Sequence, residues 1–456
     1  MRSAASQWNA APVLLRGLEG RAPSPGNREI QGDRVELNPA CVVGSSAGDH
    51  AAIHRLLLSV FHAPSLDGFH ASLDDPFYEP RNRLVVKRGE QIVSHLHLTE
   101  RTTYFGGRQL PAAHLAWLAT LPEFRGCGYG SQLLGAADCV MVEGGAALGL
   151  LSTRLPHFFR RAGWAVCGRH SHARAGSRDL LAQLSAAGLP PCERPLNIRP
   201  WRQVELPALM ALYERNQSQA FGAYQRSEAY WRWLVSRKGF DHIYVAFDGP
   251  GRCELDLSGA PIVGYVITQE DRILELMADP AHPSAAEQLL ARACGDAIER
   301  DDHAITLYAS PGHRLLELFE RSGGAVCRSE IHQGEVFMAK LLDPLGFLQS
   351  LCGELHSRAA HTGLERPCEL GISLEGEKCR LVVSRRSVKL ARGKLGRSYL
   401  RLSAPEFTRL VLGHLDVGEA AACGRLRAST RHAAEIARAL FPRLPFWRSP
   451  LDELVV

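Results

Sequence analysis

The 456-residue sequence lacks several features that would mark a specialised class of protein. Its twelve cysteines include no C-x-x-C pair and no regular spacing, which argues against a disulfide framework or zinc site and predicts no metal. No dense block of lysine and arginine accompanies the net charge of +5, so neither nucleic-acid nor membrane binding is indicated. No apolar run is long enough for a membrane span, and residues 1–36 contain none that fits a signal peptide. We therefore expect a cytoplasmic protein with reduced thiols.

The length and the element pattern predict several domains. We expect residues 1–36 to be a disordered extension. Residues 37–185 alternate between strand and helix patterns, and "RLVVKRGEQIVSHLHL", residues 83–98, predicts a hairpin of two β-rich runs about a glycine-containing turn. After the proline-rich joint "AAGLPPCERPLNIRP" the pattern repeats loosely over residues 186–341. Residues 342–456 read as strands followed by helices, a small α+β unit. The predicted fold class is thus α/β for the first two parts and α+β for the third.

The stretch "LPEFRGCGYGSQLL" places three glycines, Gly126, Gly128 and Gly130, between a buried strand over 114–121 and an amphipathic helix. Glycine is costly in an ordered backbone unless a positive φ or a close approach to the main chain is needed. A helix N-terminus also offers unpaired N–H groups and a partial positive charge, which suit an anion. The stretch therefore predicts a phosphate cradle.

Three other interpretations compete with that one. A Rossmann dinucleotide site would place an acidic residue after the next strand, where "ALGLLST" is followed by Arg154. A nucleotide P-loop would end in Gly-Lys-Ser/Thr, which is absent. A glycine-rich turn without any ligand is the third.

The pattern Arg125-x-x-Gly128-x-Gly130 after a buried strand, followed by "LLSTRLPHFFRRAGW", resembles the acyl-CoA signature of GNAT-superfamily N-acetyltransferases. In domain order the chain resembles the Eis (enhanced intracellular survival) family, which has two tandem GNAT folds and a sterol-carrier-like C-terminal domain. The resemblance implies acetyl-CoA as co-substrate, an amine on a small molecule or peptide as acceptor, and direct attack in a ternary complex. The family's hexamers suggest that this chain forms a homo-oligomer. His282, Pro283 and Ser284 replace the glycines in the second half, which we expect to be degenerate and without CoA.

The resemblance also assigns a cofactor site to particular residues. The pantetheine arm would pair with the main chain of Leu118, Ala119 and Thr120. Arg154 and Leu155 would meet the acetyl end. The pyrophosphate would be held by Arg125 and by main-chain N–H groups of a run of six residues, Gly126, Cys127, Gly128, Tyr129, Gly130 and Ser131.

Proton transfer is less well defined. In the resembled family a tyrosine of the last helix protonates the leaving thiolate, but Phe159 occupies that position and has no proton to give. His157 is one substitute, with an exposed helix-end histidine as the structural alternative. His114, on the strand before the glycines, is another, with a core histidine as its alternative.

The C-terminus and one acidic loop supply the remaining candidates. The family uses its C-terminal carboxylate as the base, which here is that of Val456, and Asp452 or Glu453 could replace it. A frayed terminus is the plainer interpretation, but the aromatic residues Phe446 and Trp447 favour a tail held in place by burial. In "SLDDPFYEP", the carboxylates over 74–79 could attract a cationic amine or could be a solvated loop.

Two rival functions stay open at this point. Without the tyrosine, the chain could be a catalytically impaired acyl-CoA sensor or scaffold. Alternatively it could bind lipid through its C-terminal domain, although "LVVSRRSVKLARGKLGRSYLRL" alternates apolar and basic residues as a half-exposed sheet does. The sequence does not identify the acceptor amine, the preferred acyl length or the number of subunits.

Overall fold

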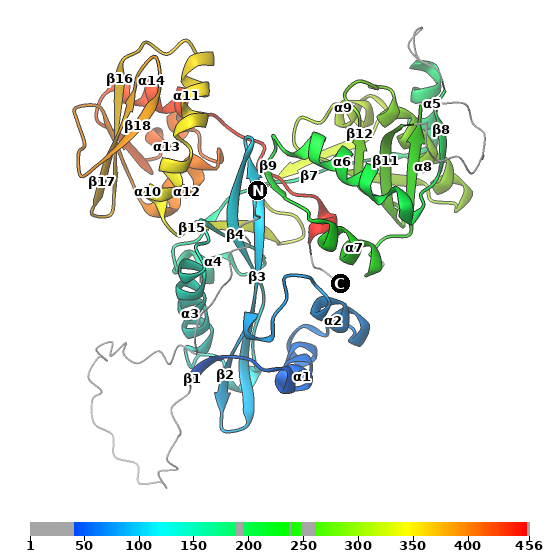
Figure 1. Cartoon of the computed structure of the whole chain (residues 1–456), viewed down its shortest axis with the longest axis horizontal. Coiled ribbons are helices and arrows are strands. Elements are labelled where there is room, and N and C mark those ends of the chain that lie inside the picture. Colours follow the sequence, from blue (N-terminus) through cyan, green and yellow to red (C-terminus); the bar gives the residue numbers. More distant parts are fainter. Residues whose placement is uncertain (1–40, 188–194, 238, 249–260, 454–456) are drawn as a thin grey trace.

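The computed structural model describes residues 41–187, 195–237, 239–248 and 261–453, so the expected N-terminal extension lies outside the described residues. Figure 1 shows three lobes, each built on its own β-sheet. Within the described ranges no helix is both long enough and apolar enough to cross a membrane. The structure is therefore a mixed α/β fold with more than one sheet, as the alternating pattern predicted.

The first sheet has eight strands and carries the glycine loop. Its path is β1 (Cys41–Gly44), β2 (Arg83–Arg88), β3 (Gln91–Phe105), β4 (Arg108–Thr120), β5 (Leu148–Thr153), β15 (Val336–Leu341) and β6 (Ala165–Val166), and β9 (Phe221–Tyr224) pairs with β3 off this path. The helices of this lobe are α1 (His50–Phe61), α2 (Leu66–Leu73), α3 (Tyr129–Glu143) and α4 (Pro156–Arg160). The hairpin that alternating residues over 83–98 predicted is formed by β2 and β3.

Helices cover both faces of this sheet because its strands alternate apolar side chains on two sides. α3 packs its buried residues, including Leu133 and Ala137, against Leu96, Leu98 and Leu115. On the opposite face, α1 and α2 form a separate apolar cluster with strand residues of β2, β3 and β4. In Figure 1 the long strands β3 and β4 separate α3 from α1 and α2. The side of the sheet that carries this cluster, with Val85 of β2, Ile92 of β3 and Ala119 of β4, is called below the α1–α2 face.

The second sheet has seven strands. Their order is β14 (Ala325–Ser329), β7 (His170–Gly176), β13 (Ala304–Tyr308), β12 (Arg272–Ala278), β11 (Ile262–Gln269), β10 (His242–Phe247) and β8 (Asn197–Pro200). The accompanying helices are α5 (Ser177–Ala187), α6 (Leu206–Gln217), α7 (Glu228–Ser236), α8 (Ala285–Glu299) and α9 (Arg314–Arg321).

The two sheets exchange strands, which the linear division at residues 185 and 341 did not anticipate. β7 precedes that first boundary yet pairs with β13 and β14 of the second sheet. Conversely, β9 and β15 come from the 186–341 segment and pair with β3 and β5 of the first sheet. Strand pairing therefore crosses both of these boundaries, because it depends on long-range contacts, which leave no signal in local composition.

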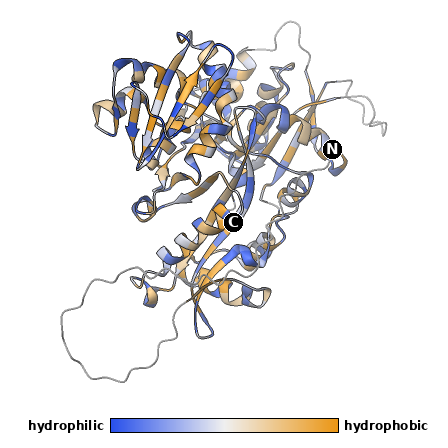
Figure 2. Cartoon of the chain, turned by 60° about the vertical axis from the view of Figure 1, so that its left-hand side comes forward, coloured by the Kyte–Doolittle hydropathy of each residue, from blue (hydrophilic) through white to orange (hydrophobic). Residues whose placement is uncertain are grey.

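The third sheet orders β18 (Val388–Arg392), β17 (Glu377–Val383), β16 (Cys368–Leu374), β19 (Tyr399–Leu402) and β20 (Leu426–Ala428). Its lobe contains α10 (Pro344–Ser350), α11 (Cys352–His361), α12 (Ala404–Val411), α13 (Val417–Ala422) and α14 (Arg431–Leu440). Hydrophilic and hydrophobic residues alternate along its strands (Figure 2), as expected for a sheet with one covered face. One apolar cluster joins this lobe to residues of the first sheet such as Phe105, Leu110 and Leu148, so the two lobes share a core.

Candidate active site

A gap opens between two parallel strands of the first sheet. β4 and β5 pair only over Ala112–Leu115 and Leu148–Leu151, although β4 continues to Thr120. The parting coincides with a β-bulge in β4, where Trp117 has φ of 56° and the register against β3 shifts. Bulges bend a strand and end local pairing, and they are common beside active sites. The edge of β4 over 116–120, which includes Leu118, Ala119 and Thr120, is therefore left without a strand on its β5 side.

The glycine loop connects the end of β4, beside this gap, to the N-terminus of α3. Gly126 and Gly128 have φ of 81° and 83°, values that residues with a Cβ rarely adopt, and Gly128 is the residue before the helix. A Cβ built at either glycine would meet nothing within 4 Å, so their backbone faces open space. The first N–H groups of α3, those of Tyr129, Gly130 and Ser131, have no carbonyl partner within the helix. Loop and helix start together form an open cradle of donors that suits a phosphate group.

The other residues assigned to the cofactor lie around this cradle. Cys127 is exposed in the loop as a free thiol. Arg125 folds back so that its Nε lies 3.4 Å from the carbonyl oxygen of Thr120. Arg154 is exposed just beyond β5, and Leu155 is 70% exposed, which is unusual for an apolar side chain. These positions border the gap and are open to a ligand.

A pocket lies on the α1–α2 face, beside the bulge. Its floor comes from the sheet, with Arg83, His97 and Trp117, and one wall comes from α7 of the second lobe, with Trp233. Arg237, directly after α7, also lines it, and the remaining lining residues belong to α1, α2 and their surroundings: Leu57, Pro64, Gly68, Phe69, Ala71 and Ser72. The space within it and at its mouth is about 410 Å³, most of it open solvent, and the enclosed part is small. The pocket and the β4–β5 gap meet at the same stretch of β4, so a donor and an acceptor could approach each other there.

Three histidines occupy this face in their neutral form. Burial lowers the pKa of His95 to about 3, with the nearby Arg83 charge adding to the effect. Burial and Arg83 also hold the pKa of His97 well below its usual value, and burial with Arg448 and Arg101 does the same for His114. The Nδ1 of His95 donates to the Trp117 carbonyl at 2.9 Å, whereas the buried Nε2 of His97 has no partner among the described residues. His97 was missed by sequence analysis, although its spacing from His95 in "VSHLHLTE" puts both rings on one strand face.

Because these histidines are neutral in the folded protein, the folded state should lose stability at low pH. A histidine whose pKa is lowered by folding binds its proton mainly in the unfolded chain, so stability is full above pH 6.5 and falls below it. For His95 alone the loss should be about 1.4 kcal/mol per pH unit between pH 6.5 and about 3. We expect His95→Gln to flatten this dependence when unfolding by urea is measured from pH 7.5 to 5. An unchanged slope would mean that the ring titrates normally in the folded protein.

The C-terminal tail is tied between the first two lobes. Its Trp447 N–H donates to the Phe221 carbonyl at 2.9 Å, and the Arg448 guanidinium lies 4.7 Å from the Tyr224 ring centroid. The tail then forms the short 3-10 turn η5 (Pro450–Asp452), whose Leu451 carbonyl accepts from Arg237. The frayed terminus is therefore ruled out as far as residue 453, while Val456 lies outside the described residues.

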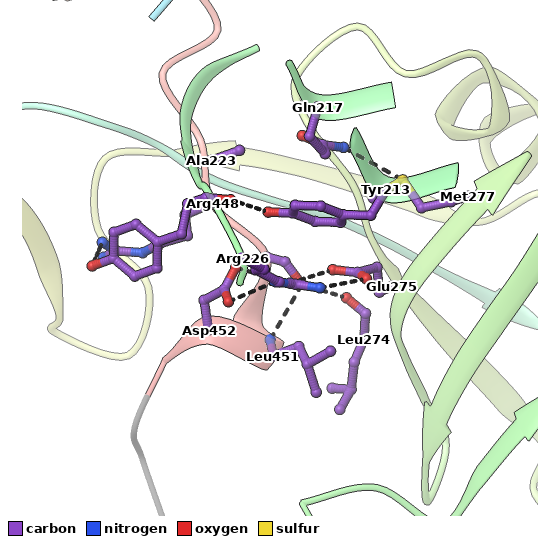
Figure 3. A network of polar contacts seen from close by, with 12 residues as sticks. Tyr213, Gln217, Ala223, Arg226, Leu274, Glu275, Met277, Arg448, Leu451 and Asp452 are labelled. Atoms are coloured by element: carbon purple, nitrogen blue, oxygen red, sulfur yellow. Dashed lines mark hydrogen bonds and ion pairs between the residues drawn. The ribbon is translucent and has the colours of Figure 1, made fainter. Parts of the chain in front are cut away.

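An ion-pair network anchors this tail (Figure 3). Arg226, fully buried, donates to both carboxylate oxygens of Glu275 at 2.9 and 2.7 Å, and to both oxygens of Asp452 at 2.9 Å. Asp452 is therefore fully engaged and is not available as a base. Its neighbour Glu453 is different, because one of its buried oxygens makes no hydrogen bond within the described residues.

Glu453 has the electrostatic setting of a general base. Burial raises its pKa to about 7, with the carboxylates of Glu335 and Asp452 adding to the increase and Arg448 opposing it. The Arg448 guanidinium lies 3.8 Å from Glu453 and is close enough to His114 to lower the pKa of that ring. Half of the Glu453 carboxyl groups would be ionised near neutral pH, where a base works best.

The other sequence candidates take structural positions. Phe159 is buried and packs against Trp164, in edge-to-face contact, on the α3 side of the sheet. His157 is exposed on the five-residue helix α4. In the acidic loop, Asp75 is buried and paired with Arg101 at 2.5 Å, so the loop does not present this carboxylate to a cationic amine.

One cluster of possible metal ligands lies away from this pocket. His172 of β7, Cys327 of β14 and His332 offer ligand atoms that all lie within 4.8 Å of one another. Their sequence separation gave no metal-binding motif, so sequence analysis missed this group. Histidine and cysteine together suit a borderline-soft cation such as zinc.

Comparison with known families identifies part of the chain. Residues 45–167, which contain the gap, the glycine loop and α3, match the acetyltransferase (GNAT) domain. No curated protein matches the sequence. The part of the first lobe over residues 45–167 is accordingly similar to a GNAT acetyltransferase domain.

Solved structures match over nearly the whole chain. A GCN5-related N-acetyltransferase from Kribbella flavida is 17% identical, with a TM-score of 0.68 over 92% of this chain and 100% of that one. A GCN5-related N-acetyltransferase from Anabaena variabilis is 16% identical, with a TM-score of 0.67 over 90% and 99%. Eis1 from Mycobacterium abscessus is 17% identical, with a TM-score of 0.60 over 89% and 98%. At these identities the likeness concerns the fold.

Proposed function

We propose that this protein transfers the acetyl group of acetyl-CoA to an amine, by direct attack in a ternary complex. The observation that carries the proposal is the parting of β4 from β5 directly before a loop with two left-handed glycines and the start of α3. The gap would take the pantetheine arm as an added strand, along Leu118, Ala119 and Thr120. The cradle over 125–131 would hold the pyrophosphate, and Arg154 and Leu155 would lie near the acyl end.

The acceptor would enter from the pocket on the α1–α2 face and meet the thioester at the bulge. Its nitrogen forms a bond to the carbonyl carbon while the carbon–sulfur bond breaks. Of the two protons that an ammonium group loses in this reaction, one goes to Glu453 and the other to the leaving thiolate. This balance needs no separate acid, so Phe159 would not prevent turnover. His114, neutral on the same face, is a hydrogen-bond partner for the attacking amine and too weak a base to replace Glu453.

The cofactor site can be tested with two matched glutamate substitutions, one at each end of α3. Gly128→Glu puts a negative charge beside the cradle, and we expect acetyl-CoA affinity measured by calorimetry to fall about tenfold or more. Gly145→Glu is the control, because Gly145 also has a positive φ and open surroundings but lies past the other end of the helix. The control should bind acetyl-CoA as the native chain does.

The outcomes separate the competing interpretations. If both variants lost acetyl-CoA affinity equally, the cause would be a general effect of backbone strain. If the native chain did not bind acetyl-CoA at all, the proposal would be contradicted. Tight binding without thiol release on a broad amine panel would favour the sensor function instead.

A further inference from the structure

The pocket on the α1–α2 face has apolar and aromatic walls but a cationic floor. Leu57, Phe69 and Trp233 supply the walls, and Trp117 lies beside Arg83 and His97 on the floor. The charged side chains among its lining residues are two arginines, Arg83 and Arg237, and no aspartate or glutamate lines it. This polarity is the reverse of what a polycationic acceptor would require.

Arg83 is buried without a carboxylate. It is 1% exposed, and its guanidinium contacts only neutral groups in the described structure: Ser72 Oγ at 2.9 Å, His95 Nε2 at 3.3 Å and the rings of Phe69 and Tyr78. Its Nε has no hydrogen-bond partner within those residues. Leaving a buried charge unpaired is costly, and the pKa of Arg83 is lowered by burial.

Arg237 reaches the same pocket from beyond α7. Its guanidinium lies 4.9 Å from the Trp233 ring centroid and donates to the Leu451 carbonyl, while its buried Nε has no partner among the described residues. Other buried arginines in the described chain do have carboxylate partners, as Arg101 has in Asp75 and Arg226 in Glu275. The two pocket arginines are therefore exceptions, and both line the pocket.

We infer that the acceptor carries a carboxylate on an apolar body, and that Arg83 and Arg237 bind this carboxylate. The free Nε2 of His97, on the same floor, provides a further polar contact for the acceptor. An apolar amino acid fits this description; a polyamine does not. This inference rests on the proposed function, because it takes the pocket to be the acceptor site.

The charge preference can be measured without turnover. Three probes of matched shape, 3-phenylpropanoate, 3-phenylpropanamide and 3-phenylpropylammonium, are titrated calorimetrically into the full-length protein with CoA present. We expect the carboxylate to bind about 10- to 100-fold more tightly than the amide, the range for hydrogen bonds to charged groups, and the ammonium most weakly. Equal or tighter binding of the amide or ammonium would overturn the inference.

Variants assign the preference to the two arginines. Arg237→Gln and Arg83→Gln should each reduce the carboxylate preference several-fold, whereas Arg232→Gln should not, since that arginine is exposed on α7 and pairs with Glu228. Arg237→Gln keeps the test valid if Arg83→Gln fails to fold. A chain ending at residue 453 should show the same preference as the native chain; a preference that appears only in the shortened chain would assign the arginines to the native chain's own terminal carboxylate and overturn the inference.

Acetyl-CoA binding and thiol release on the same samples separate the two ideas. Carboxylate preference without acetyl-CoA binding would refute the transferase while leaving the anion pocket. Acetyl-CoA turnover on amines without any carboxylate preference would support the transferase and refute the anion pocket.

Discussion

Arg226→Met should lower the free energy of unfolding by about 3–5 kcal/mol, the usual cost of removing one partner from a buried ion pair. The guanidinium is fully buried between Glu275 and Asp452, so its removal leaves two carboxylates in an apolar setting with no cation. The loss should also release the tail that Asp452 anchors. Urea denaturation measures the first effect, and proteolysis after residue 441 measures the second.

Two controls make this expectation specific. Arg232→Met breaks an exposed pair with Glu228 and should cost less than about 1 kcal/mol. Combining Arg226→Met with Glu275→Gln and Asp452→Asn removes all three charges and should recover much of the stability, because neutral side chains cost less to bury. A single substitution that costs no more than the surface control would show that the network contributes little.

Glu453→Gln should reduce kcat by about 10²- to 10⁴-fold, the usual contribution of a general base, while acetyl-CoA affinity stays unchanged. The base acts in its ionised form, and its pKa is raised to about 7. The native rate should therefore rise about tenfold per pH unit below pH 7 and level off above it. The variant should lack this rising limb of the pH–rate profile.

Glu335→Gln provides the matched control. Glu335 is one of the carboxylates that raise the pKa of Glu453, so its neutralisation should move the limb to lower pH without abolishing turnover. If Glu453→Gln retained the native rate and pH profile, the base would have to be sought elsewhere, with the carboxylate of Val456 as the next candidate.

Local patterns predicted the parts of this molecule that short-range physics decides. The spacing of Gly126 and Gly128 between a strand and a helix indicated left-handed backbone at a helix start, because that geometry excludes most other residues. The β2–β3 hairpin and α3 likewise followed from period-2 and period-3.6 patterns. The tail's aromatic residues indicated burial, as found for the segment up to residue 453.

Long-range pairing could not be inferred in the same way. Asp75 is an ordinary loop acid in the sequence, and only the fold reveals that Arg101 buries and neutralises it. The pocket brings Arg83, His97 and Trp233 together from three elements that have no common motif. The exchange of β7, β9 and β15 between sheets is a property of topology, which composition does not encode.

The strand exchange has a consequence for how the chain is made. β15 lies between β5 and β6, so the first sheet lacks an inner strand until residues 336–341 leave the ribosome. Until then the outer edge of β5 presents unpaired main-chain groups, a surface that invites aggregation and chaperone capture. The sheet that carries the glycine loop is therefore completed only after the strands of the second lobe have been synthesised. Gene fragments that stop near residue 185 would encode an open-edged intermediate rather than a complete first sheet.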